Sequence, residues 1–112
     1  MHSFAIVAIF LGFALLTDSA YGQSEHRCTK DALVQAQKLL EFHFGPDNRI
    51  AVDKSVKVLV PIRNPAETKQ QFDVLEVWGS IYKGRYRMRL IYAQIPKECL
   101  LMGQEILEYA HL

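Results

Sequence analysis

The chain has 112 residues, half of them hydrophobic, with a formal net charge of +1 and two cysteines. A chain of this length holds one domain, because a second core would need roughly 50 residues of its own. The near-zero net charge argues against a dedicated nucleic-acid-binding protein and against an acidic tail, both of which normally have a strongly one-sided charge.

The first 22 residues are typical of a secretory signal peptide. Residues 4–16 form an apolar run without a charge, and this run is shorter than the roughly 20 residues that span a membrane. Ala20, Tyr21 and Gly22 then form a small-x-small site that suits signal peptidase. We expect cleavage after Gly22, which leaves residues 23–112 as one exported domain, periplasmic or extracellular, without a stable membrane anchor. An uncleaved anchor is the alternative, because no Lys or Arg precedes the apolar run.

The two cysteines, Cys28 and Cys99, predict one structural disulfide in an exported chain. Closing a loop of about 70 residues contributes ~4 kcal/mol to stability in the chain-entropy description. No C-x-x-C pair occurs in the sequence, so thiol exchange and zinc binding have little support.

One helix is predicted directly after Cys28. Thr29 can cap this helix, and Asp31 lies in its first turn, where a negative charge suits the helix dipole. Gly45 and Pro46 end it. The apolar residues that recur at helical spacing are Leu33, Ala36, Leu39, Leu40 and Phe44.

Beyond a turn at Asp47 and Asn48 the apolar period changes to two, which is typical of strands. Residues 56–62 predict a half-buried strand, and Pro61 indicates an edge position or a bulge. Residues 71–82 and 85–95 predict a hairpin with a tight turn at Lys83-Gly84, where glycine would supply the positive φ. The residues of the first strand that are expected to face the core are Val56, Val58, Val60 and Ile62.

Residues 99–109 fit two structures. Cys99, Gly103 and Ile106 lie on a possible helix stripe that Pro96 would start. The same residues also fit a fourth strand with a bulge at Gly103. We favour the strand, because it gives an α+β domain in which one N-terminal helix covers a four-stranded antiparallel meander, stapled by one disulfide.

This layout resembles the YebF and colicin M immunity protein group. The matching features are the exported chain, Cys28 just before a single helix that runs to Phe44, Cys99, and Glu108-Tyr109-Ala110 near the end. The resemblance implies a cystatin-like roll, in which one helix is wrapped by an antiparallel sheet. The bacteriocin-binding role of that group is not implied, because no recognition residues can be matched.

The predicted hairpin sorts its side chains onto two faces. A two-residue turn pairs Tyr82 with Arg85, which puts Trp78 opposite Arg89 and suits cation–π stacking in both pairs. A slip by one residue would mix the faces. The inner face collects Leu75, Val77, Gly79, Ile81, Tyr86, Met88, Leu90 and Tyr92. The outer face collects the candidate partner-binding residues Trp78, Tyr82, Arg85, Arg87 and Arg89.

Catalytic and metal-binding signatures are missing from the sequence. No nucleophile elbow, H-E-x-x-H motif or phosphate-binding glycine loop occurs. His26, His43 and His111 do not suggest a metal site, and Asp73 and Glu76 would point to opposite faces of a strand. We therefore expect no catalytic residue, metal or cofactor.

Two hypotheses of function follow. The first is a small exported binding module, of the inhibitor or immunity type, whose Trp/Tyr/Arg face holds an acidic protein partner. This face is a candidate because Trp, Tyr and Arg are enriched at interface hot spots. The plainer interpretation is a solvated outer face that keeps the sheet soluble. The second hypothesis is a ligand-binding roll with a pocket between the helix and the concave sheet around Tyr86, Met88 and Tyr92. A homodimer through an exposed strand edge stays open, and nucleic acid is not an expected partner.

Overall fold

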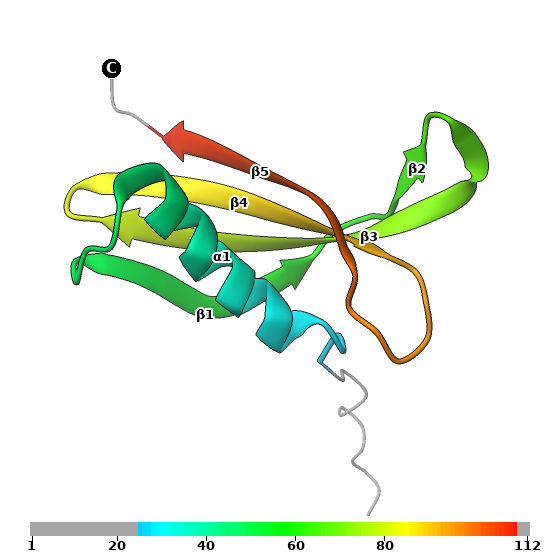
Figure 1. Ribbon diagram of the computed structural model, residues 1–112, viewed down its shortest axis with the longest axis horizontal. Coiled ribbons are helices and arrows are strands. Elements are labelled where there is room, and N and C mark those ends of the chain that lie inside the picture. Colours follow the sequence, from blue (N-terminus) through cyan, green and yellow to red (C-terminus); the bar gives the residue numbers. More distant parts are fainter. Residues whose placement is uncertain (1–24, 110–112) are drawn as a thin grey trace, which may run out of the picture.

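Helix α1 (Thr29–Phe44) buries one face against the sheet in the computed structural model, which describes residues 25–109 (Figure 1). Its buried residues are Ala32, Ala36, Leu39 and Leu40. The predicted end is confirmed, since Gly45 has a φ of +77° and its N–H donates to the Glu41 carbonyl oxygen at 2.8 Å. The predicted cap is wrong. Cys28 occupies the N-cap without a side-chain hydrogen bond, and Thr29 is already helical.

The strands form one antiparallel sheet in the order β1 (Ile50–Val58), β3 (Glu67–Ile81), β4 (Gly84–Ala93) and β5 (Leu101–Tyr109). A short strand, β2 (Ile62–Asn64), also pairs with β3. The domain is therefore α+β, with one helix on an antiparallel sheet, but it has five strands where four were predicted.

The fifth strand arises because the predicted strand at residues 56–62 is interrupted. Leu59 still donates its N–H to the Val74 carbonyl oxygen at 2.8 Å, but Pro61 has no N–H to continue the ladder. The core-facing row predicted for this strand holds only at Val56, which packs against the core. Three residues of that row are exposed instead: Val58 by 51%, Val60 by 83% and Ile62 by 43%.

The hairpin of β3 and β4 keeps the predicted faces but not the predicted partners. Arg85 pairs with Ser80, which lies two residues before the predicted partner Tyr82. A shift by two residues preserves the alternation of faces, so the inner and outer sets are unchanged. The turn consists of Tyr82 and Lys83, and Tyr82 rather than a glycine takes the positive φ, at +54°.

The last segment is a strand, as favoured from the sequence. It begins at Leu101 rather than at Cys99. Leu101 pairs with Tyr92 and Gly103 pairs with Ile91, so Met102 is the extra residue of a bulge next to the predicted position.

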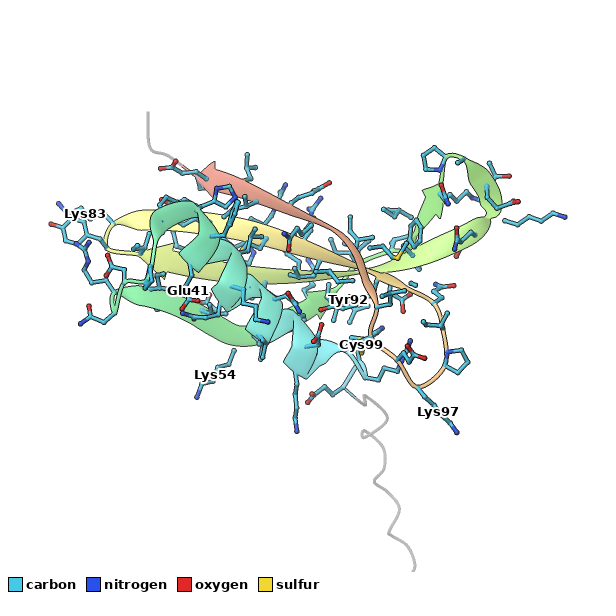
Figure 2. All side chains as sticks on the ribbon, viewed as in Figure 1. Glu41, Lys54, Lys83, Tyr92, Lys97 and Cys99 are labelled. Atoms are coloured by element: carbon cyan, nitrogen blue, oxygen red, sulfur yellow. A yellow bond between two sulfur atoms is a disulfide. The ribbon has the colours of Figure 1, made fainter. Side chains whose placement is uncertain are left out.

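The core lies between α1 and the inner face of β1, β3 and β4 (Figure 1). Gly79 allows the closest approach of the helix, because a Cβ atom at this position would lie 2.8 Å from Leu40 Cδ1. Tyr92, which is labelled in Figure 2, is fully buried. Its hydroxyl group donates to Asp31 Oδ2 at 2.7 Å.

The disulfide between Cys28 and Cys99 is present, with a Cα–Cα distance of 5.6 Å. It ties the start of α1 to the loop between β4 and β5. None of the helices within residues 25–109 is long and apolar enough to cross a membrane. The predicted signal peptide, residues 1–22, lies outside the described residues.

Candidate functional site

Trp78 is the centre of a stacked cluster on the outer face of the sheet. The Arg85 guanidinium group lies over its ring, 5.1 Å from the ring centroid. The Tyr109 ring contacts Trp78 edge to face, with 4.9 Å between centroids. Arg87 lies 6.0 Å from the Tyr109 ring and donates to its hydroxyl oxygen at 3.4 Å. We call Trp78, Arg85, Arg87 and Tyr109 the stacked cluster. Such contacts hold large side chains in place before any partner binds.

Glu76 is the buried anion beneath these cations, with 8% of its surface exposed. Its carboxylate accepts hydrogen bonds from Arg89 Nε at 3.0 Å and from Trp78 Nε1 at 3.2 Å. Arg87 Nε lies further away, at 3.9 Å. A buried carboxylate needs such partners, so Glu76 fixes the orientation of the Trp78 indole.

The arginine row is less positive than its sequence indicates. Arg85 forms an ion pair with Asp53 at 3.2 Å, and Arg89 forms one with Glu76. Among the carboxylates of residues 25–109, Arg87 contacts only that of Glu76, at 3.9 Å, so its charge is the least neutralised of the three.

The predicted stacking pairs are wrong in detail. Trp78 pairs across the strands with Arg87 and stacks with Arg85, whereas the sequence predicted Arg89. Tyr82 is 71% exposed at the hairpin tip, where it lies 5.4 Å from the Arg49 guanidinium group and 5.6 Å from Lys83 Nζ. The structure thus brings together four of the five candidates, Trp78, Arg85, Arg87 and Arg89, and places Tyr82 apart from them.

An apolar groove of about 360 Å³ lies on the outer face of the sheet beside Arg89. The break between β1 and β2 exposes its walls, and Arg89 and Glu105 supply its polar atoms. Its lining residues are Leu59, Val60, Ile62, Val74, Arg89, Ile91 and Glu105. The groove was not predicted from the sequence, in which the only signal for it is Pro61, the residue that marks where the strand breaks.

Two of the three residues predicted to line a ligand pocket lie in the filled core, since Met88 and Tyr92 have no exposed surface and pack beneath α1. Tyr86 is 6% exposed and also belongs to the core. Its ring, however, lines a hollow at the end of α1.

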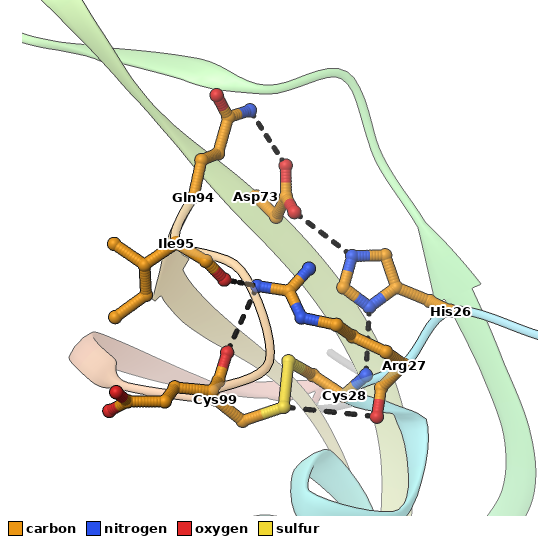
Figure 3. A network of polar contacts seen from close by, with 8 residues as sticks. His26, Arg27, Cys28, Asp73, Gln94, Ile95 and Cys99 are labelled. Carbon is orange, nitrogen blue, oxygen red and sulfur yellow. Dashed lines mark hydrogen bonds and ion pairs between the residues drawn. A yellow bond between two sulfur atoms is a disulfide. The ribbon is translucent and has the colours of Figure 1, made fainter.

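A polar network surrounds the start of the chain that the structure describes (Figure 3). His26 Nε2 lies 2.9 Å from Asp73 Oδ2, and His26 Nδ1 accepts the Cys28 N–H at 3.0 Å. Arg27 donates to the carbonyl oxygen of Ile95 and, at 2.9 Å, to that of Glu98. Both imidazole nitrogens are therefore engaged, which leaves neither free to act as a general base.

Asp73 is the anionic member of this network. Burial works to raise its pKa, but hydrogen bonds from Gln94 and His26 outweigh burial, and the pKa lies below its usual value. Within residues 25–109, no group of three or more His, Cys, Asp or Glu side chains could hold a metal ion. Through the bonds of Arg27 to the carbonyl oxygens of Ile95 and Glu98, the network fastens the start of the domain to the β4–β5 loop.

No protein-family model, curated protein or solved structure matches the chain.

Proposed function

We propose that the protein is a small exported, non-enzymatic binding module, of the inhibitor or immunity type, that holds a protein partner on the outer face of its sheet. The observation that carries this proposal is the stacked cluster, in which Trp78 is only partly buried yet is held by Arg85 and Tyr109. A side chain that is already ordered loses little conformational entropy on binding.

The proposed partner is acidic at one point and apolar beside it. Arg87, the least neutralised arginine, would receive a carboxylate of the partner, because Arg85 and Arg89 already have acidic neighbours. The apolar groove next to Arg89 would take an aliphatic or aromatic side chain. An interface of this kind combines a buried apolar anchor with a charged contact that sets its position.

The proposed architecture for this module is a cystatin-like roll. In support, β1 and β2 both pair with the same side of β3, so they replace one long strand of a four-stranded meander. One helix covers this sheet, and the disulfide joins the helix start to the segment before β5. The oxidised cysteine pair fits an exported protein.

Capture of the partner with matched variants tests the proposal. The tagged domain would be incubated with cell extract and growth medium of its own source, beside Arg87→Gln and the control Lys54→Gln, which removes the same charge from an exposed position on β1. We expect Arg87→Gln to weaken capture of a specific protein about tenfold or more, and Lys54→Gln to leave capture unchanged. Equal capture by both variants would remove the outer face from consideration.

A further inference from the structure

A second hollow, of about 280 Å³, lies on the opposite side of the molecule from the stacked cluster. It forms where the last turn of α1 ends above β4 and β5. The helix packs on β1, β3 and β4, so the inner face of β5 lies beside the helix rather than beneath it. The lining residues are His43, Phe44, Tyr86, Ile106 and Glu108.

Two aromatic rings form the apolar part of this hollow. The Phe44 ring lies 4.9 Å from the Tyr86 ring and is tilted by 51°. Phe44 is 42% exposed, whereas Tyr86 is 6% exposed and forms the floor. Gly84 leaves room for the Tyr86 ring, because a Cβ atom there would lie 2.6 Å from the Tyr86 hydroxyl oxygen. The rings are therefore in place without a ligand.

Glu108 contributes the charge of the hollow. It pairs directly with Tyr86 across β4 and β5, so both side chains lie on the inner face. Burial raises the pKa of Tyr86, and the negative charge of Glu108 raises it further. Within the described part of the chain, the Glu108 carboxylate forms no ion pair with a Lys, Arg or His side chain. Glu76 on the other face, by contrast, has two arginines.

The edge of the sheet beside the hollow is open. β5 is the last strand in the order β1-β3-β4-β5, so its outer backbone groups have no strand partner within residues 25–109. An extended peptide can pair with such an edge, and alternate side chains of that peptide would then lie on the inner face.

We propose that this hollow receives a lysine side chain from an extended segment of a partner protein that pairs along β5. Aromatic faces attract an ammonium group, and the apolar stem of lysine suits the walls formed by Phe44 and Ile106. The Glu108 carboxylate supplies the opposite charge. A second copy of β5 is a poorer occupant, because β5 carries Glu105 and Glu108 and no Lys or Arg. This inference is independent of the proposed function, since it uses the other face of the sheet.

Titration of the ¹⁵N-labelled protein with two matched peptides tests the proposal. The probes are acetyl-Thr-Val-Lys-Val-Thr-amide and the same peptide with norleucine in place of lysine. We expect the lysine peptide to cause saturable amide shifts along β5 and at the end of α1. We expect the norleucine peptide to bind about tenfold more weakly. Glu108→Gln should weaken the lysine peptide by a similar factor and leave the norleucine peptide unchanged. Glu98→Gln, which removes the same charge from an exposed position in the loop before β5, is the control and should change neither.

Five results would overturn the proposal. The first three are equal affinity for the two peptides, an equal loss of affinity in Glu98→Gln, and no saturable shift at the hollow. The fourth is n-butylammonium binding as tightly as the lysine peptide, which would assign the hollow to a free amine rather than to an extended segment. The fifth is dimerisation through β5 in sedimentation experiments, which would assign the edge to a second copy of the chain.

Discussion

Gly79→Ala tests how closely α1 packs on the sheet. The new methyl group would lie 2.8 Å from Leu40 Cδ1, 3.1 Å from Met88 Cε and 3.2 Å from the Ala51 carbonyl oxygen. The side chains of Leu40 and Met88 are fully buried. The Ala51 carbonyl belongs to β1 where it pairs with β3, so it cannot retreat without disturbing the ladder.

Two opposing contributions set the size of the effect. Overpacking of this kind costs about 1–3 kcal/mol, and replacing glycine by alanine returns about 0.4–1 kcal/mol by restricting the unfolded chain. We therefore expect a net loss of about 1–2 kcal/mol in the free energy of unfolding. For a domain of this size that loss lowers Tm by roughly 4–16 °C.

Urea unfolding followed by circular dichroism measures this loss. Gly103→Ala is the matched control, because its Cβ atom would lie 3.6 Å from Ile91 Cδ1, an ordinary contact. We expect the control to gain about 0.4–1 kcal/mol, because it restricts the unfolded chain without overpacking the folded one. In a Leu40→Ala background the cost of Gly79→Ala should fall to less than half. An unchanged cost in that background would refute the explanation from close packing.

Three further predictions concern the disulfide, the polar network and the core. The variant with both Cys28→Ala and Cys99→Ala should lose about 4 kcal/mol in the free energy of unfolding, because the disulfide closes a long loop with a sequence separation of 71. A loss below about 1 kcal/mol in chemical denaturation would contradict this expectation. The folded pKa of Asp73 lies below its unfolded value of about 3.9, so its stabilising contribution is complete above that pH and disappears as the pH falls through the folded pKa. As the pH is lowered from about 6 to about 2, the free energy of unfolding should therefore fall less in Asp73→Asn than in the parent protein. Tyr92→Phe removes the hydroxyl group that donates a hydrogen bond to the first turn of α1 and should cost about 1 kcal/mol in thermal unfolding; a more stable variant would contradict the assigned bond.

The alternation of side chains was enough to predict the faces of the sheet. Val77 and Met88 face the core, and Trp78 and Arg87 face outward, as their sequence positions indicate. The exact register could not be predicted in the same way, because pairings that differ by two residues give the same two faces. A turn with a positive φ at Tyr82 contradicts the usual preference for glycine.

The candidate site was predictable in composition but not in its contacts. The row of arginines is visible in the sequence, whereas its neutralisation depends on Asp53 from β1 and Glu76 from β3. An arginine side chain is long enough to reach beyond the residue directly opposite it on the next strand. Strand pairing alone therefore does not determine which ring Arg85 covers. The groove beside them requires the break at Pro61, whose effect on exposure depends on the three-dimensional course of β1 and β2.

The position of the disulfide has a mechanical consequence. A pulling force applied between residue 25 and Tyr109 would enter at Cys28 and pass directly through the sulfur–sulfur bond to Cys99. The helix and β1 to β4 lie inside that covalent loop, so the force would not extend them. The load would fall on the contacts of His26 and Arg27, which precede the loop, and on β5, which lies at the edge of the sheet and is held by its pairing with β4. Under tension the oxidised domain should therefore lengthen by the release of these contacts and of β5, while its core stays folded.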